Sequence, residues 1–146
     1  MPSDGMLRFV NRLHRGLIYL SAGRMGWGMA GMPVLELTTV GRHSGRMRRV
    51  MLTTPHQEGE TLVVVASKGG EDSHPAWYLN LLDNPNAVVA RKGRQVQRMR
   101  ARVASGAERE RLWPAVTGAY SGYATYQEKT DREIPLVLLE AVHGQN

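Results

Sequence analysis

The sequence predicts one α+β domain whose antiparallel strands form a sheet that curls into a barrel. Three observations support this fold class. The predicted strands mostly follow one another through short turns, whereas a doubly wound sheet would alternate strands with helices. The length of 146 residues suits one domain, and a hydrophobic content of 42% is sufficient for a core. The chain also shows no repeat and no linker long enough to divide it.

The N-terminal part, residues 1–33, is predicted to precede the barrel core at residues 34–146. Residues 5–22 predict an amphipathic helix, because hydrophobic side chains recur at helical spacing and three arginines share the opposite face. This helix either packs on the domain with a solvated basic side or lies on an anionic membrane surface. Residues 23–33 contain five glycines or prolines and predict an irregular connector.

The first predicted strand covers residues 34–40, where hydrophobic and polar residues alternate. A polar loop at residues 41–46 separates it from a second strand at residues 47–54, so these two strands are expected to form a hairpin. Residues 58–60, Glu-Gly-Glu, predict a turn into a third strand at residues 61–67.

A helix is predicted to begin after Pro75 and to end at Leu82, because the polar residues 83–86 that follow favour a turn. Two further strands are predicted at residues 87–91 and 95–103, around a Lys-Gly-Arg turn.

The C-terminal third is predicted to contain two helices and a final strand. Ser105 and Glu108 have the spacing of a capping box, in which each side chain bonds a free N–H group at the helix start. This pattern predicts a helix that runs to about Ala119. A short helix at residues 122–129 and an apolar strand at residues 135–142 complete the predicted order.

The composition narrows the classes of function. The formal net charge is +6 and the pI is about 10.2, which favours an anionic partner such as nucleic acid, anionic lipid, or a phosphorylated or carboxylated small molecule. The absence of cysteine excludes disulfides, thiolate metal sites and a cysteine nucleophile. No apolar run approaches the roughly 20 residues that span a bilayer, and no signal peptide is evident. We therefore expect a cytoplasmic protein.

The loop and strand start at residues 41–49 place five cationic or potentially cationic side chains within eight positions. A charge run of this kind is often only a solvated hairpin tip. Two glycines and a serine beside the arginines, however, supply additional donors that are useful for binding phosphate. Both interpretations stay open from the residues alone.

A second candidate segment is the turn Ser67-Lys68-Gly69-Gly70, which is followed by Trp77 and Tyr78 at the start of a helix. Glycines let backbone N–H groups approach a ligand, lysine adds positive charge, and the aromatic residues offer flat apolar area. The alternative is a tight turn beside a helix whose aromatic residues pack on the sheet. The turn and the arginine loop lie at the ends of strands that we expect to be neighbours, so we predict a joint ligand site.

Tyr120, Tyr123 and Tyr126 recur at intervals of three residues, which would place three phenols on one helix face. Buried phenols need hydrogen-bond partners, so a pocket wall is as good an interpretation as a core stripe. The five histidines show no metal-ligand spacing, no G-x-S-x-G elbow is present, and no carboxylate pair stands out. Such a site suits redox chemistry on a cofactor better than hydrolysis.

These segments together resemble a known family. Residues 37–45, 67–70, 74–81, 123–126 and 130–135 are similar, in this order, to the deazaflavin-dependent nitroreductase family. Its members use coenzyme F420, a 5-deazaflavin with a phosphate and an oligoglutamate tail. The resemblance implies a split β-barrel of the kind that binds FMN, with flanking helices. It also implies an F420-dependent oxidoreductase that transfers a hydride from reduced deazaflavin to a quinone, an enone or a nitroaromatic acceptor.

The resemblance implies roles for individual residues. Ser67 and Tyr123 would donate a hydrogen bond or a proton to the acceptor, and Tyr120, Tyr123 and Tyr126 would bind the acceptor. The implied cofactor-binding residues are Arg42, His43, Ser44, Arg48, Arg49, Val50, Met51, Leu52, Thr53, Val65, Ala66, Ser67, Lys68, Ala76, Trp77, Tyr78, Leu79 and Asn80.

One residue departs from the family pattern, and several alternatives stay open. The family commonly has lysine where this chain has His43, and a neutral imidazole binds a polyanion more weakly. The alternatives are an FMN-binding split-barrel oxidoreductase, a non-catalytic module that binds deazaflavin or lipid, and, from charge alone, a nucleic-acid binder. The basic residues cluster at one loop and not along an exposed face, which disfavours nucleic acid. The resemblance favours peripheral association with the inner face of the cell membrane through the N-terminal helix. The oligomeric state is left open.

Overall fold

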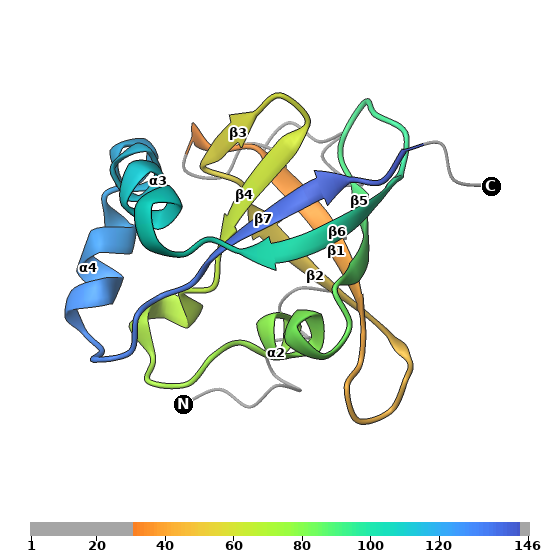
Figure 1. Ribbon diagram of the computed structural model, residues 1–146, viewed down its shortest axis with the longest axis horizontal. Coiled ribbons are helices and arrows are strands. Elements are labelled where there is room, and N and C mark those ends of the chain that lie inside the picture. The colour runs from red at the N-terminus through yellow and green to blue at the C-terminus, as the bar shows by residue number, and fades with distance from the viewer. Residues whose placement is uncertain (1–30, 144–146) are drawn as a thin grey trace.

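A seven-stranded antiparallel sheet forms the centre of the computed structural model, which describes residues 31–143 (Figure 1). The N-terminal helix and most of the connector predicted from the sequence lie outside these residues. The strands are ordered β2-β1-β5-β6-β7-β4-β3, and every neighbouring pair is antiparallel. Their bounds are β1 Val34–Val40, β2 Met47–Thr53, β3 His56–Glu58, β4 Thr61–Val65, β5 Asn86–Ala90, β6 Gln97–Val103 and β7 Leu136–Ala141.

Three α-helices and a short 3₁₀ turn accompany the sheet in the described residues. They are η2 Lys68–Gly70, α2 Ala76–Asp83, α3 Gly106–Ala119 and α4 Gly122–Glu128. Helices α3 and α4 lie side by side at the left of Figure 1, and α2 lies below the sheet. Among the helices of residues 31–143, none combines the length and the hydropathy required to cross a membrane.

The predicted α+β class with a curled antiparallel sheet is confirmed, and the predicted strands and helices of this region differ from the observed bounds by at most two residues. One strand was not predicted. β3 is polar and only three residues long, so it carries no alternating pattern. It follows β2 after Thr54 and Pro55, although β2 and β3 stand at opposite ends of the strand order. The chain itself therefore joins the two edges of the sheet, which explains the curl.

Thr54 stabilises this connection between the two edges. Its backbone N–H donates to the carbonyl of Pro33, and its hydroxyl donates to the carbonyl of Val63 at 2.8 Å. The side chain is buried, so these bonds satisfy polar groups that would otherwise be unpaired in the core.

The predicted start of α3 is confirmed, but the predicted capping box does not form. Ser105 occupies the N-cap position with extended backbone and makes no capping bond with its side chain. Glu108 instead accepts two hydrogen bonds from the guanidinium of Arg102, at 2.6 and 2.9 Å. A paired ionic contact on β6 thus replaces the weaker bond to the helix backbone.

Strands β4 and β7 separate the two larger apolar clusters of the described residues. Successive side chains of a strand point to opposite faces, so Leu62 and Val64 pack toward α2 while Val63 and Val65 pack toward α3 and α4. All four side chains are buried. The end of β4 is therefore fixed from both sides, and the turn that follows it starts from a rigid support.

Candidate functional site

A cavity of about 510 Å³ opens between the 41–46 loop, the edge strand β2, the 67–70 turn, the start of α2 and the three tyrosines. This volume falls within the range of small-molecule and cofactor sites. The described residues that line it are Met32, Val34, Thr39, Gly41, Arg42, His43, Ser44, Arg48, Arg49, Val50, Met51, Leu52, Thr53, Val65, Ser67, Lys68, Gly69, Pro75, Ala76, Trp77, Asn80, Tyr120, Tyr123 and Tyr126.

All the predicted site residues line this cavity except three. Ala66 is buried in the core, Leu79 packs against the core, and the Tyr78 ring lies 4.7 Å from the ring of His74. The helix explains two of the exceptions: Ala76, Trp77 and Asn80 share one face of α2, whereas residues 78 and 79 are turned away from it. A contiguous sequence motif on a helix therefore includes some residues that do not line the cavity.

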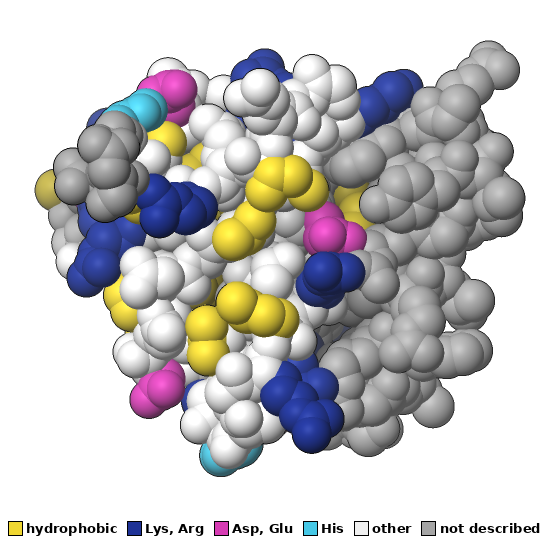
Figure 2. Space-filling model, turned by 90° about the vertical axis from the view of Figure 1, so that its right-hand side faces the viewer, with side chains coloured by type: hydrophobic (Ala, Val, Ile, Leu, Met, Phe, Trp, Pro, Cys, Tyr) yellow, Lys and Arg dark blue, Asp and Glu magenta, His cyan; other side chains and the backbone are white. Residues whose placement is uncertain are grey.

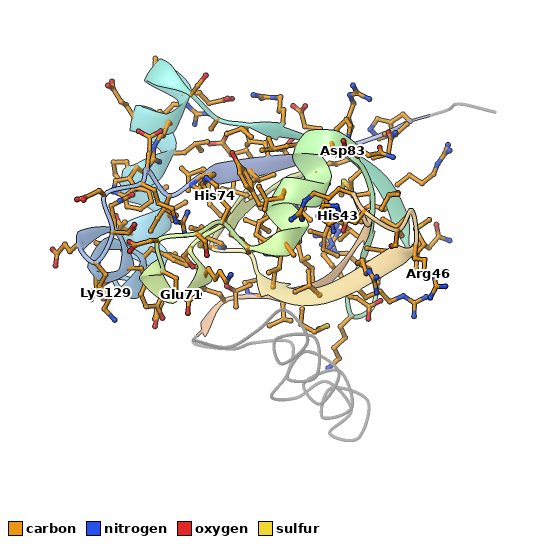
Figure 3. The ribbon with its side chains drawn as sticks, turned by 90° about the horizontal axis from the view of Figure 1, so that it is seen from below. His43, Arg46, Glu71, His74, Asp83 and Lys129 are labelled. Atoms are coloured by element: carbon orange, nitrogen blue, oxygen red, sulfur yellow. The ribbon has the colours of Figure 1, made fainter. Side chains whose placement is uncertain are left out.

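The strands that carry the two predicted binding segments are not neighbours. β2 is at one edge of the sheet, and β4 is separated from it by four strands. The expected convergence of the two segments is nevertheless observed, because the curl of the sheet brings both to the same cavity. Figure 3 shows His43 and Arg46 toward one end of the molecule and Glu71 and Lys129 at the other, with α2 between them.

Asn80 anchors the 41–46 loop to α2. Its side chain is 5% exposed; Oδ1 accepts the backbone N–H of Arg42 at 3.1 Å, and Nδ2 donates to the hydroxyl of Thr39 at 3.1 Å. Within the loop, the N–H of Gly41 donates to the carbonyl of Arg46 at 2.8 Å. A buried amide that satisfies two partners fixes the backbone of the loop while its arginine side chains stay exposed.

The loop presents positive charge to the cavity. Arg42, Arg48 and Arg49 line it, and none of its described lining residues is acidic. Ser44 orients this group, because its hydroxyl oxygen accepts the N–H of Arg46 at 3.1 Å and Nη2 of Arg48 at 3.4 Å. Arg46 is not a lining residue and extends outward from the loop (Figure 3). Figure 2, which views the molecule from the right-hand side of Figure 1, shows lysine and arginine side chains at several places, in keeping with the net charge of +6.

The 67–70 turn exposes unpaired backbone donors at the cavity. Ser67 is right-handed, with φ −78° and ψ −37°, whereas Lys68 and Gly69 are left-handed, with φ +46° and +65°. A right-handed residue followed by a left-handed one makes consecutive N–H groups converge on an anion-binding concavity. The N–H groups of Ser67, Lys68 and Gly69 have no acceptor within residues 31–143. They are therefore available to an electronegative ligand atom.

The side chain of Lys68 is held beside this turn. Its Nζ donates to the hydroxyl of Ser73 at 3.3 Å and lies 3.8 Å from a carboxylate oxygen of Glu71. Lys68 is also the one non-glycine residue with positive φ in the described part of the chain. Such a conformation is unfavourable for a residue with a Cβ atom, so the surrounding structure must impose it.

Arg132 binds backbone carbonyls on both sides of Lys68, although in the sequence it stood out only as part of a family-like segment. Its guanidinium donates to the carbonyls of Ala66, Ser67 and Glu71 at 3.2, 2.8 and 2.8 Å. The same group lies 3.0 Å from Nδ1 of His74. Burial lowers the pKa of His74, and the positive charge of Arg132 adds to this effect. The neutral imidazole can thus accept from the guanidinium.

The three tyrosines form a contiguous wall, but not on one helix. Tyr120 caps the end of α3, while Tyr123 and Tyr126 belong to α4, and the ring centroids lie 5.1 to 6.4 Å apart. Tyr123 is 5% exposed and its hydroxyl is hydrogen-bonded to that of Thr53 at 2.8 Å. Burial raises the pKa of Tyr123. A hydrogen bond with Tyr120, together with burial, raises the pKa of Tyr126.

Comparison with known proteins gives a consistent result. The model of the F420H(2)-dependent quinone reductase family matches residues 10–141. An F420H(2)-dependent quinone reductase of Mycobacterium tuberculosis is 34% identical over 134 residues, which cover 88% of this chain and 87% of that protein. The solved structure of an F420-H2 dependent reductase is 42% identical, with a TM-score of 0.66 over 74% of this chain and 94% of the other.

A more distant structure supports the fold alone. A pyridoxamine 5′-phosphate oxidase-like protein of Listeria innocua is 11% identical, with a TM-score of 0.53 over 90% of this chain and 94% of the other. The curled sheet is therefore a split barrel, as the resemblance implied.

Proposed function

This chain belongs to the F420H(2)-dependent quinone reductase family, and we propose from its cavity how its residues hold coenzyme F420 and an electron acceptor. The protein is accordingly an oxidoreductase whose cofactor is coenzyme F420. We propose a quinone as the preferred electron acceptor. An enone or a nitroaromatic compound is proposed as an alternative acceptor at the same site. The observation that carries the proposal is one cavity with a basic loop, unpaired N–H groups and a tyrosine wall.

The charges of the cavity fit a cofactor with a phosphate and an acidic tail. Arg42, Arg48 and Arg49 are proposed to bind these groups, because guanidinium pairs its N–H groups with the oxygens of phosphate and carboxylate. Ser44 keeps Arg48 in place. His43 contributes charge only when protonated, so its contact is proposed as the weakest of the loop.

The 67–70 turn is proposed to hold the polar edge of the deazaflavin ring. Its unpaired N–H groups are donors for ring oxygens, and Lys68 adds positive charge nearby. Apolar surface for the ring comes from Leu52, Val65 and Trp77, which line the same cavity. Trp77 also belongs to the core cluster, so its ring is fixed before any ligand binds.

Reduced coenzyme F420 supplies a hydride when it is bound, and the residues proposed around the acceptor exclude water and stabilise negative charge. The tyrosine wall lines the cavity, and its aromatic rings are proposed to face the acceptor. Ser67 is the better placed of the two predicted donors, because its hydroxyl has no partner within residues 31–143, whereas that of Tyr123 is bound to Thr53. A donor directed at the charge that develops on the acceptor accelerates the transfer.

The proposal is tested by titrating the purified protein with F420 and by following the absorbance of the deazaflavin during turnover with a quinone. We expect saturable binding and oxidation of the reduced cofactor by the quinone. A protein that neither binds F420 nor supports hydride transfer would contradict the proposal. A yellow preparation that retains FMN and ignores F420 would favour the flavin alternative.

Peripheral membrane association is a second, separate proposal. It is supported by the net charge of +6 and by the basic amphipathic helix predicted at residues 5–22. We expect the full chain to sediment with anionic vesicles and not with zwitterionic ones, and a variant without residues 1–30 to remain in the supernatant. Equal sedimentation of both forms would contradict a role of the helix.

A further inference from the structure

We infer that Arg132 is a positioning residue that directs the N–H groups of the 67–70 turn into the cavity. The inference rests on the proposed function of that turn. Arg132 itself does not line the cavity and lies in the segment between α4 and β7. It acts through the backbone carbonyls of Ala66, Ser67 and Glu71, to which its guanidinium donates at 3.2, 2.8 and 2.8 Å.

The geometry of the peptide group explains this action. In a trans peptide, the carbonyl of one residue and the N–H of the next point in opposite directions, and the described chain contains only trans peptides. Because Arg132 holds the carbonyl of Ala66, the N–H of Ser67 points away from the guanidinium. The carbonyl of Ser67 is held in the same way, so the N–H of Lys68 also points away. One side chain thereby fixes the direction of two donors.

The charge of Arg132 strengthens the same donors. Hydrogen bonds from a charged donor are shorter and stronger than neutral ones, and a peptide group polarised at its oxygen becomes a better donor at its nitrogen. The bonds to Ser67 and Glu71 also flank Lys68, whose left-handed backbone is unfavourable without such support. A lysine at position 132 would retain the charge, but one ammonium lacks the planar fork that serves separated carbonyls.

Helix α4 holds Arg132 in place. Gln127 donates from Nε2 to the carbonyl of Arg132 at 2.8 Å, and its Oε1 accepts the N–H of Ile134 at 2.9 Å. The same helix carries Tyr123 and Tyr126 of the proposed acceptor wall. The turn, through Arg132, and the tyrosine wall are thus both tied to one helix.

The test uses Arg132→Lys, with Arg102→Lys as the matched control. Arg102 also donates to several oxygens, those of Glu108 and Glu140, but lies outside the cavity lining. Two quantities are measured: the dissociation constant for F420, and amide hydrogen exchange in the free protein at Gly70 and Glu71. The N–H groups of these two residues donate to the carbonyls of Ser67 and Lys68, so they report directly on the turn.

We expect Arg132→Lys to weaken F420 binding by about tenfold or more, the scale of a lost charged hydrogen bond, and to accelerate exchange at Gly70 and Glu71. We expect Arg102→Lys to change neither. In the native protein, F420 should slow exchange at Lys68. Native exchange together with native affinity in Arg132→Lys would overturn the inference, and the proposed function would stand. If the native protein does not bind F420, the proposed function fails, whereas exchange in the free protein still decides whether Arg132 shapes the turn.

A milder variant keeps the inference testable if Arg132→Lys does not fold. Gln127→Glu preserves size but removes the donor to the carbonyl of Arg132. We expect it to weaken F420 binding in the same direction by a smaller factor and to accelerate exchange at Gly70. An unchanged affinity with unchanged exchange would overturn the inference.

Discussion

The 41–46 loop and the 67–70 turn reach the same cavity but are held in opposite ways. The loop is a hairpin connection whose arginines are exposed, and Asn80 is its long-range anchor among the described residues. The turn follows a buried strand, contains left-handed residues and is bound at three carbonyls by Arg132. Charge acts at a distance and tolerates mobile side chains, whereas donors aimed at a ring require fixed peptide planes. We therefore propose that the loop contributes mainly affinity for the cofactor and the turn mainly its orientation.

The largest expected effect breaks the support of the turn. Gly70 has φ +85°, and a Cβ atom there would lie 2.7 Å from the backbone oxygen of Tyr126. We expect Gly70→Ala to lower the free energy of unfolding by about 2–5 kcal/mol, since left-handed strain costs about 1–2 kcal/mol and overpacking about 1–3 kcal/mol. F420 affinity should fall as well. Urea denaturation and F420 titration measure both quantities.

Gly69→Ala is the matched control for this prediction. Gly69 is also left-handed, at φ +65°, but a Cβ atom there would meet nothing within 4 Å. Only the strain of about 1–2 kcal/mol should remain. Equal losses of stability in the two variants would show that the contact between the turn and α4 contributes nothing.

The next effect concerns the basic side chains of the 41–46 loop and of the start of β2. Arg48→Ala should weaken F420 binding by roughly 1.5–3 kcal/mol, the scale of a hydrogen bond to a charged group, without a comparable loss of stability. Added salt should reduce this difference, because exposed charges are screened. Arg46→Ala is the control, since Arg46 belongs to the same loop but does not line the cavity. An equal loss of affinity in both variants would indicate general attraction to the loop rather than a specific contact.

A smaller effect is expected at the tyrosine wall. Tyr123→Phe removes the hydrogen bond to Thr53 and should lower the free energy of unfolding by about 1 kcal/mol. Turnover with a quinone should fall while the affinity for F420 stays nearly intact, because Tyr123 is proposed to line the acceptor side. Tyr126→Phe, compared by steady-state kinetics, shows whether the effect belongs to this one hydroxyl. A parallel loss of affinity and turnover in Tyr123→Phe would remove the separation between the two sides.

The same two regions show what the sequence can predict. The order of strands and helices, the arginine loop and the tyrosine cluster depend on local patterns and were predictable. The role of Arg132 was not, because its contacts with the turn join residues 61 to 66 positions apart. Nor was the anchoring role of Asn80, which lines the cavity as a predicted ligand contact and also satisfies Thr39 and the loop backbone. Contacts of this kind are made by the curl of the sheet, and the curl depends on a strand, β3, that has no pattern of its own.

The smallest expected effect is a pH dependence that belongs to the turn and not to the loop. Burial, and secondarily the charge of Arg132, lower the pKa of His74 below its ordinary value of 6.5. At pH values between 6.5 and the lowered pKa, the unfolded chain binds more protons at this histidine than the folded protein does. The contribution of neutral His74 to the free energy of unfolding is therefore complete above pH 6.5 and decreases as the pH falls through this window. His74→Gln should flatten this part of the profile of unfolding free energy against pH, because glutamine does not titrate. His143→Gln, at an exposed histidine that does not contact Arg132, is the control and should leave the contribution of His74 in place. If the native protein and His74→Gln have the same profile, protonation of His74 does not disturb Arg132, and the support of the turn is insensitive to this neighbour.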